Sequence, residues 1–307
     1  MSNPDLCAVT GANGFSGRSI ARRLLSKGTR VLNLTGHPDR PHDLGDGVTS
    51  VSYNFDDPAA LARSLHGVNV LYNNYWIRFA HGDMTFDKAV ANSKTLIKAA
   101  EDAGVGRIVH VSIANPSEDS PLPYYKGKAA VEKAITSSNI PYAILRPAVL
   151  FGDQGILINN IAWFLRHVPV FGVPGSGQYK MQPIFVEDLA DLAVEWGEKH
   201  ENVIIDAVGP EAFSFNDWVH LIAQAVHSKT LIMHFPPSIA LIATGIIGAL
   251  VGDVILTPDE VAGLQANLLV SSHPPTAGTK LSDWLHDNAD WIGTTYFSEL
   301  KRHFAGS

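Results

Sequence analysis

The stretch that decides the fold is Val9-Thr10-Gly11-Ala12-Asn13-Gly14-Phe15-Ser16-Gly17-Arg18, close to the N-terminus. It follows a short apolar run and precedes Ile20-Ala21-Arg22-Arg23-Leu24-Leu25, which has a helical apolar pattern. A strand, a glycine-rich turn and a helix in this order form the phosphate-binding corner of dinucleotide-binding folds. Gly11 permits a tight turn, Gly14 lets a pyrophosphate approach the backbone, and Gly17 lets the helix pack closely on the strand. The sequence therefore predicts a dinucleotide site.

Strand-like and helix-like segments alternate through the first half of the chain, as a parallel sheet with crossover helices requires. We expect an α/β fold with a Rossmann-type doubly wound parallel sheet. The dinucleotide-binding domain is expected over residues 1–150, and a smaller, mainly helical substrate lobe that shares the same core over residues 151–307. Further expected strands are Arg30–Leu34, Val51–Phe55, Val68–Tyr72, Arg107–Ser112, Ala143–Pro147 and Val203–Ala207.

The composition is that of an ordinary globular protein. Of 307 residues, 46% are hydrophobic and 17% charged, and the formal net charge is −7. A negative chain without a Lys/Arg cluster argues against a nucleic-acid partner. The single cysteine, Cys7, excludes an internal disulfide, and the histidines show no metal-ligand spacing, so no metal site is expected. The first residues show no signal pattern, which predicts a cytoplasmic protein.

One segment, Ile239–Val251, is apolar on all sides. It is shorter than the roughly 20 residues that span a bilayer, so a membrane contact is not the expectation. A buried helix or a contact in a homo-oligomer is the favoured interpretation. A wall for an apolar substrate and a peripheral membrane contact are the alternatives.

Chemistry is indicated by Tyr124 and Lys128, which lie four residues apart and so one turn apart on the same face of a helix. A phenol with a pKa near 10 is a poor acid–base group at neutral pH until a nearby cation lowers that pKa. The pair predicts a hydride-transfer site in which Tyr124 passes a proton and Lys128 tunes it and binds the nicotinamide ribose. The alternative is a helix end with a packed aromatic ring and a solvated lysine.

The Thr-Gly-Ala-x-Gly-x-x-Gly wording of Thr10–Gly17 resembles the extended and atypical short-chain dehydrogenase/reductases. This family includes NAD-dependent epimerase/dehydratases and relatives of the Rossmann-type accessory subunit of respiratory complex I. Its catalytic dyad matches Tyr124 and Lys128. The resemblance implies that Pro147 lines the nicotinamide and that Asp56 faces the adenine. It also implies that the dinucleotide contacts the turn residues Gly11, Asn13, Gly14, Phe15, Ser16 and Gly17.

The match weakens at the third catalytic group. In the extended family a hydroxyl that bonds the substrate oxygen sits a residue or two beyond Ser112, where this chain has Ile113 and Ala114. Ser112 is the candidate for this role, and Asn115 is an alternative hydrogen-bond donor. The departure puts ordinary carbonyl reduction in doubt.

The cofactor preference is indicated by the end of the second strand. No carboxylate stands there to bind a ribose 2′-hydroxyl. Gly36 leaves room instead, and His37, Arg40 and Arg18 are candidates to meet a 2′-phosphate. We therefore expect NADP(H), with NAD(H) as the alternative.

Together these features predict an NAD(P)(H)-dependent oxidoreductase that binds a dinucleotide and a small-molecule substrate. Residues 73–82 and 155–166 are candidate substrate-contacting segments, although the substrate itself is not readable from the sequence. A nucleotide-sugar epimerase or dehydratase with the same dyad is one alternative. The other is a non-catalytic protein in which the dinucleotide is structural or a redox signal.

Overall fold

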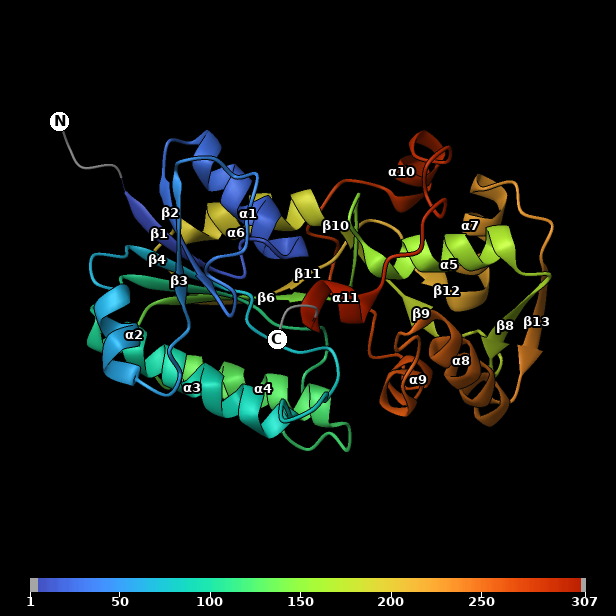
Figure 1. Ribbon diagram of the computed structural model, residues 1–307, viewed down its shortest axis with the longest axis horizontal. Helices are drawn as coiled ribbons and strands as arrows, with labels where there is room; N and C mark the ends of the chain where they lie inside the picture. The colour runs from blue at the N-terminus through green and yellow to red at the C-terminus, as the bar shows by residue number, and fades with distance from the viewer. Residues whose placement is uncertain (1–4, 305–307) are drawn as a thin grey trace. The chain divides into compact units, whose positions relative to one another are not determined.

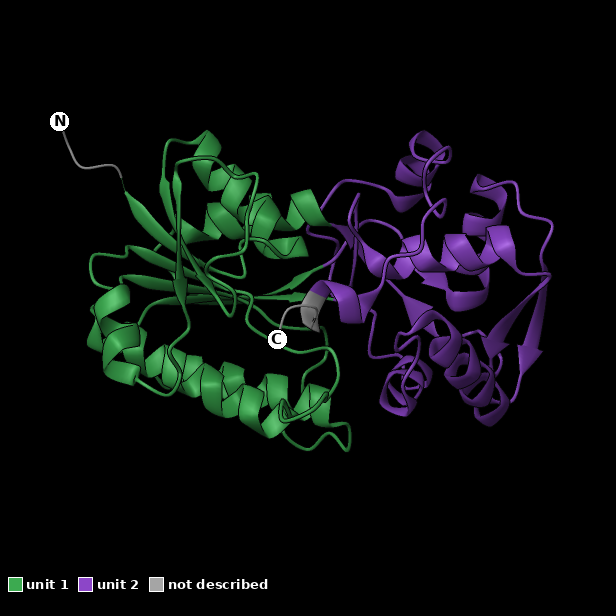
Figure 2. Cartoon of the chain, viewed as in Figure 1, with its two compact units in different colours: residues 1–147, 186–207 green, residues 148–185, 208–307 purple. Residues whose placement is uncertain are grey.

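The computed structural model describes residues 5–304, with side chains as far as residue 302. Residues 1–4, part of the segment in which the sequence shows no signal pattern, lie outside the described residues. The chain forms two compact units (Figure 2). Unit 1 contains the chain as far as Pro147 and also Val186–Ala207, and unit 2 contains Ala148–Phe185 and the chain from Val208 onward. The boundary expected near residue 150 lies close to the point where the chain first leaves unit 1.

A seven-stranded sheet forms the centre of unit 1 (Figure 1), with strand order β11-β6-β5-β4-β1-β2-β3 and parallel pairing throughout. Strand order reverses at β1, which pairs with β2 on one side and β4 on the other, so a ligand crevice is expected at the carboxyl ends of these strands. The predicted Rossmann-type fold is confirmed. The strands are β1 (Leu6–Thr10), β2 (Arg30–Thr35), β3 (Val48–Ser52), β4 (Val70–Asn73), β5 (Arg107–Val111), β6 (Tyr142–Pro147) and β11 (Val203–Ala207).

Helices cover both faces of this sheet. Helices α1 (Phe15–Ser26) and α6 (Val186–Gly197) pack together on one face, and α2 (Pro58–Ser64), α3 (Phe86–Asp102) and α4 (Pro123–Thr136) lie side by side on the other (Figure 1). Strands buried on both faces read as continuous apolar runs, which is why the sequence pattern reveals most of them.

An aspartate side chain caps the N-terminus of α2. The Asp57 side chain accepts a 2.9 Å hydrogen bond from the backbone N–H of Ala60, and Pro58 occupies the first turn. The N–H groups of a first helical turn have no partner within the helix, so this bond satisfies one of them.

The third strand was predicted too late in the chain. It spans Val48–Ser52 rather than Val51–Phe55, because β2 pairs with it from Val31↔Val48 to Thr35↔Ser52. Tyr53 and Phe55 lie beyond its end with rings stacked 4.9 Å apart, and Asn54 between them has a positive φ of 47°. Their alternation with polar residues is typical of a strand, which explains the late prediction, but in the structure the two rings stack on each other beyond the strand end.

Unit 2 has a hydrophobic cluster of its own, built around the fully buried Phe151 and Trp218. Its strands form three two-stranded sheets, β7–β10, β9–β12 and β8–β13. The strands are β7 (Val149–Phe151), β8 (Val170–Pro174), β9 (Lys180–Met181), β10 (Pro183–Phe185), β12 (Phe213–Ser214) and β13 (Leu231–Phe235). The helices are α5 (Ile156–His167), α7 (Phe215–Ala225), α8 (Pro237–Val251), α9 (Pro258–Gln265), α10 (Leu281–Asp287) and α11 (Glu299–Phe304).

The apolar segment forms α8, but the interpretation as a buried helix is wrong for most of it. Ala240 and Gly248 are its buried residues, whereas Ile242, Ile246 and Leu250 are 60% exposed or more. Gly248 is buried because the chain beyond the end of α8 folds back over it, and a Cβ on it would lie 2.6 Å from the carbonyl oxygen of Asp253. Among residues 5–304, none of the helices has the length and apolar character needed to cross a bilayer.

Candidate functional site

The glycine-rich turn connects β1 to α1 with the geometry that the three glycines allow. Gly11 has a φ of 65°, a left-handed conformation that favours glycine. A Cβ on Gly17 would lie 2.3 Å from the carbonyl oxygen of Gly11, so only glycine lets α1 approach the turn this closely. A Cβ on Gly14 would lie 3.1 Å from the same oxygen. The turn is therefore compact at its three glycines.

A residue that sequence reasoning missed holds this turn in place. Asn33, fully buried in β2, accepts a 2.8 Å hydrogen bond from the backbone N–H of Ala12 and donates one of 2.9 Å to Ser50. A buried amide must be paired to be tolerated, and here both ends of it are. The available signal was an asparagine within an otherwise apolar strand, Arg30–Thr35.

Side chains also tie β1 to β4 at the reversal of strand order. The Thr10 hydroxyl accepts a 2.6 Å hydrogen bond from the backbone N–H of Asn74 and donates to Asn73 over 3.4 Å. The Ser16 hydroxyl donates to Asn74 over 3.3 Å, which links the start of α1 to the loop after β4. The first half of the loop 73–82 is thus fixed beside the glycine-rich turn.

The start of α1 suits an anionic ligand. Its first turn contains no acidic residue, and Gly14 at the N-cap supplies no side-chain hydrogen bond to it. Helix N-termini carry partial positive charge and N–H groups that donate hydrogen bonds to phosphate oxygens. In addition, Asn13 Oδ1 is buried and has no protein partner. These residues fit the pyrophosphate of a dinucleotide.

The predicted phosphate contacts lie in the turn after β2. The backbone N–H of Arg40 bonds the carbonyl oxygen of His37 over 3.1 Å, and no atom lies within 4 Å of a Cβ built on Gly36. Arg18 forms an ion pair with Asp43 from the same loop. Asp56, predicted to face the adenine, is an exposed residue in the turn between β3 and α2.

Tyr124 and Lys128 lie on α4, and aromatic rings surround the tyrosine. Its ring makes edge-to-face contacts with Trp76 at 5.9 Å and with Phe86 at 6.0 Å. Tyr124 is half-buried, whereas Lys128 is only 3% exposed. The alternative of a solvated lysine is therefore wrong, because Lys128 is enclosed.

Burial changes the acid–base behaviour of Lys128. Its ammonium donates a 2.9 Å hydrogen bond to the carbonyl oxygen of Val111. Loss of water lowers the pKa of Lys128 to about 7, and the charge of Glu132 opposes part of that effect. Desolvation disfavours the charged form of an amine, so this lysine titrates near neutral pH.

Ser112 is directed toward Glu132. Its hydroxyl donates a 2.5 Å hydrogen bond to Glu132 Oε1, and both residues are buried. Arg146 donates two further bonds to the same carboxylate, from Nε over 3.0 Å and from Nη2 over 2.5 Å. A serine hydroxyl has one hydrogen to donate, and in this structure Glu132 receives it. Glu132 and Arg146 are further residues of the site that carry no predicted role.

The strand ends beside Ser112 are closed by backbone pairing. The backbone N–H of Ala114 bonds the carbonyl oxygen of Pro147 over 2.8 Å, so this oxygen already has a partner. Asn115, the alternative donor, has a positive φ of 53°. Two residues before Ser112, His110 is fully buried, and its Nδ1 lies 3.1 Å from the carbonyl oxygen of Asn73. Burial lowers the pKa of His110 well below its usual value, and Lys128 adds to this effect.

The second candidate substrate segment forms α5 in unit 2. Asn159 and Asn160 on this helix donate to the carbonyl oxygens of Thr295 and Phe297, each over 2.8 Å. Its apolar side joins the unit 2 cluster, while Leu157 is exposed. The polar residues of α5 thus hold the C-terminal segment of unit 2.

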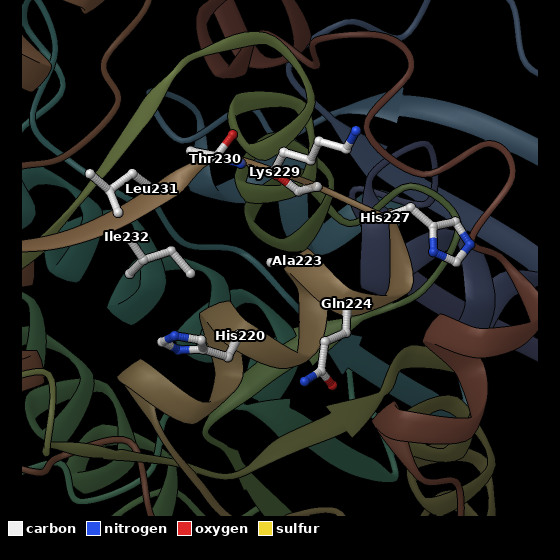
Figure 3. Close-up of a pocket in the computed structure, with 9 residues that line it drawn as sticks. His220, Ala223, Gln224, His227, Lys229, Thr230, Leu231 and Ile232 are labelled. Atoms are coloured by element: carbon white, nitrogen blue, oxygen red, sulfur yellow. Dashed lines mark hydrogen bonds between the residues drawn. The ribbon is translucent and has the colours of Figure 1, made fainter.

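A separate open pocket lies in unit 2 between the end of α7 and β13 (Figure 3). His220, Gln224 and His227 line it together with Lys229, and no predicted site residue is among its lining residues. Within residues 5–304, no group of three or more His, Cys, Asp or Glu residues is placed to hold a metal ion.

Comparison with known proteins finds an NAD(P)H-binding domain in the N-terminal half of the chain, which contains the glycine-rich turn. Residues 11–160 match the family described as NAD(P)H-binding. A 198-residue stretch is 29% identical to subunit 9 of the NADH dehydrogenase [ubiquinone] 1 alpha subcomplex of Arabidopsis thaliana, covering 62% of this chain and 49% of that protein. The subunit of the same name from Dictyostelium discoideum is 26% identical over 239 residues, which are 73% of this chain and 65% of that protein. The chain thus spans about half to two thirds of the length of these mitochondrial relatives.

Solved structures share the fold. An NADPH-dependent quinone oxidoreductase from Escherichia coli, complexed with NADPH, has a TM-score of 0.75 and 20% identity, covering 92% of this chain and 99% of that one. A nucleoside-diphosphate-sugar epimerase from Staphylococcus aureus has a TM-score of 0.71 and 14% identity, covering 92% and 99%. Together with the glycine-rich turn and the match over residues 11–160, these likenesses show an NAD(P)H-binding domain on a Rossmann-type fold that is also found in quinone oxidoreductase and epimerase structures.

Proposed function

We propose that this protein is an NADP(H)-preferring oxidoreductase in which Tyr124 donates the proton and Lys128 tunes Tyr124 and binds the nicotinamide ribose. The observation that carries the proposal is the enclosure of Lys128 on α4, one turn from a half-buried Tyr124. Burying an ammonium costs desolvation free energy unless a partner of opposite charge or a hydrogen-bond acceptor offsets it. A phenolate formed at Tyr124 would be such a partner.

The chemistry follows from these two side chains. A reduced dinucleotide held by the glycine-rich turn and Lys128 would supply a hydride to the substrate carbon and would itself be oxidised. Tyr124 donates its phenolic proton to the substrate oxygen, which becomes a hydroxyl, and the ammonium of Lys128 stabilises the phenolate that remains. The proton is then recovered from solvent, so the net change is reduction of a carbonyl group to an alcohol.

The rings around Tyr124 support a flat, unsaturated substrate. Trp76 and Phe86 offer faces and edges on which a conjugated carbonyl compound or a quinone can pack. One structural neighbour of this chain is a quinone oxidoreductase, which agrees with such a substrate class.

A non-catalytic role is the second candidate, and Ser112 favours it. The hydroxyl that would assist the substrate oxygen donates instead to Glu132, and Ile113 and Ala114 follow it. The curated relatives of this chain include subunits of NADH dehydrogenase, so a bound dinucleotide that serves assembly or redox sensing is consistent with them. A nucleotide-sugar epimerase would use the same dyad without net oxidation.

Replacing Tyr124 by phenylalanine tests the enzymatic proposal. Tyr124→Phe keeps the ring and its packing but removes the titrating group, so turnover should fall by about 10²-fold or more. Tyr125→Phe is the matched control, because it removes a hydroxyl from the neighbouring residue of the same helix. The measurement is a screen of quinones, carbonyl compounds and nucleotide sugars, with NADPH absorbance and product analysis as readouts.

The outcomes separate the candidates. Loss of turnover in Tyr124→Phe but not in Tyr125→Phe supports the proposed reductase. Equal turnover in Tyr124→Phe and the wild type overturns the role of Tyr124. Binding of NADPH by a wild type that converts no substrate of the screen supports the non-catalytic protein, and sugar epimerisation without change in absorbance supports the epimerase.

A further inference from the structure

A buried network of charged and polar side chains lies between α4 and the carboxyl ends of β5 and β6. Ser112, Lys128 and Glu132 in this network are each at most 5% exposed. Arg146 is partly exposed and forms its ion pair with Glu132. A Rossmann core needs no such cluster for stability, because buried charges cost desolvation and apolar residues would serve as well.

Glu132 is the member of this network with three hydrogen bonds to its carboxylate. One comes from Ser112 and two from Arg146, on two different strand ends. Bonds from a guanidinium and a hydroxyl at two different strand ends hold the carboxylate in one orientation. The negative charge is therefore fixed in place.

Lys128 precedes Glu132 by four residues on α4, so the two side chains emerge on the same face of the helix. The Lys128 ammonium bonds the carbonyl oxygen of Val111, an uncharged partner. The titratable or charged groups on the elements around it are Tyr124 and Glu132 on α4, His110 on β5 and Arg146 on β6. Of these, Glu132 raises the pKa of Lys128, and Lys128 in turn lowers the pKa of His110. His110 is neutral near pH 7 because burial lowers its pKa, so Glu132 supplies the negative charge that favours the ammonium.

We propose that Glu132 is a positioning residue of the dinucleotide site, whose buried carboxylate keeps the neighbouring Lys128 side chain in its charged, ribose-binding form. The inference rests on the proposed function, in which the ammonium of Lys128 binds the ribose. Ser112 and Arg146 act through Glu132, because they fix where its charge lies.

The test is the pH dependence of NADPH affinity between pH 5 and pH 9, measured by calorimetric titration. In the wild type, affinity should be highest at low pH and fall as Lys128 loses its proton. Glu132→Gln keeps the shape and hydrogen-bond acceptor but removes the charge, so the pH at which affinity falls should drop by about one unit or more. Glu132→Asp keeps a charge set back by one methylene and should lower that pH by less.

A matched control uses a second serine–glutamate pair of unit 1. Ser19 donates a 2.7 Å hydrogen bond to Glu187 at the start of α6, on the opposite face of the sheet from α4. Glu187→Gln therefore removes a carboxylate of the same kind without approaching Lys128. It should leave the midpoint of the pH profile unchanged. The NADPH phosphate titrates in the same way with every variant, so it does not account for a difference between their profiles.

The possible failures are distinguishable. If wild-type affinity does not fall with pH, or Lys128→Met binds NADPH as the wild type does, the ribose role of Lys128 in the proposed function is wrong. If Lys128→Met abolishes the pH dependence but Glu132→Gln leaves its midpoint in place, the role of Glu132 alone is overturned. If Glu132→Gln does not fold, Glu132→Asp decides, because an unshifted midpoint there contradicts the inference.

Discussion

The ammonium of Lys128 lies 4.9 Å from the centroid of the Trp76 ring. Trp76 belongs to the loop after β4 and also packs against α4, where a Cβ on Gly127 would lie 2.7 Å from its ring. The loop thus covers the helix face that carries the lysine and excludes water from it. The ring face attracts the cation, but it does not replace the lost hydration, which is why the pKa of Lys128 falls to about 7.

This enclosure predicts a stability that rises with pH. The unfolded chain keeps the Lys128 proton to about pH 10, whereas the folded protein loses it near pH 7, so between these values the unfolded state binds more protons. Stability should therefore increase from pH 7 to 8.5 by up to about 1.4 kcal/mol per unit from this one group. Urea unfolding at several pH values measures the free energy of unfolding. The range from pH 7 to 8.5 is chosen because Cys7, whose pKa is raised to about 11, lowers stability with rising pH only above that range.

Lys128→Met is the control for this effect. The variant keeps an unbranched apolar chain but has no proton to lose, so its stability should change less with pH than that of the wild type. It should also be more stable than the wild type at pH 7, because no ammonium has to be desolvated. Parallel pH profiles of the two proteins would show that Lys128 titrates normally and is not enclosed.

Dinucleotide binding should depend on Gly14. In Gly14→Val the side chain would occupy the surface of the turn that a pyrophosphate approaches, and NADPH affinity should fall by at least about tenfold, as expected for loss of one or more charge-assisted bonds. The Cβ meets the carbonyl oxygen of Gly11 at 3.1 Å, so a modest loss of stability is also expected. Gly278→Val, at a glycine with open space around it, is the control. Normal NADPH affinity in a folded Gly14→Val protein would contradict the site.

The preference for NADP(H) should depend on Arg40. The wild type is expected to bind NADPH more tightly than NADH, and Arg40→Ala should weaken NADPH binding by about 1–3 kcal/mol while leaving NADH binding in place. Arg22→Ala is the matched control, because Arg22 is an exposed arginine of α1 that pairs with Asp43. Titration of both dinucleotides decides, and tighter binding of NADH by the wild type would overturn the preference.

The exposure of α8 predicts that shortening one of its exposed side chains has little effect on the free energy of unfolding. Leu250 is 82% exposed, so Leu250→Ala should change the free energy of unfolding by less than about 0.5 kcal/mol. Leu165 on α5 is 1% exposed, and the same substitution there should cost about 2–5 kcal/mol through lost packing and a cavity. Chemical denaturation of both variants checks this. A large loss in Leu250→Ala would mean that the residue is covered in solution.

The glycine-rich turn, the buried strands and the placement of Tyr124 and Lys128 on one helix were predictable because each depends on local sequence. Gly11, Gly14 and Gly17 encode a backbone path, and apolar runs encode buried strands. The shift of β3 to Val48–Ser52 was not predictable, because pairing with β2 fixes the strand and aromatic residues continue its pattern beyond the end. Likewise, the apolar sequence of α8 predicts a helix but not which of its faces the rest of unit 2 covers.

By itself the sequence determined that this chain binds a dinucleotide on a Rossmann fold and that Tyr124 and Lys128 share a helix face. Only the tertiary structure decided what surrounds them. Asn33, from strand β2, accepts a hydrogen bond from the glycine-rich turn, and the Trp76 ring covers Lys128. Glu132 accepts the hydrogen bond that Ser112 donates. Such contacts join residues far apart in the chain, and the pKa of Lys128 depends on burial and nearby charge, which a linear pattern does not encode.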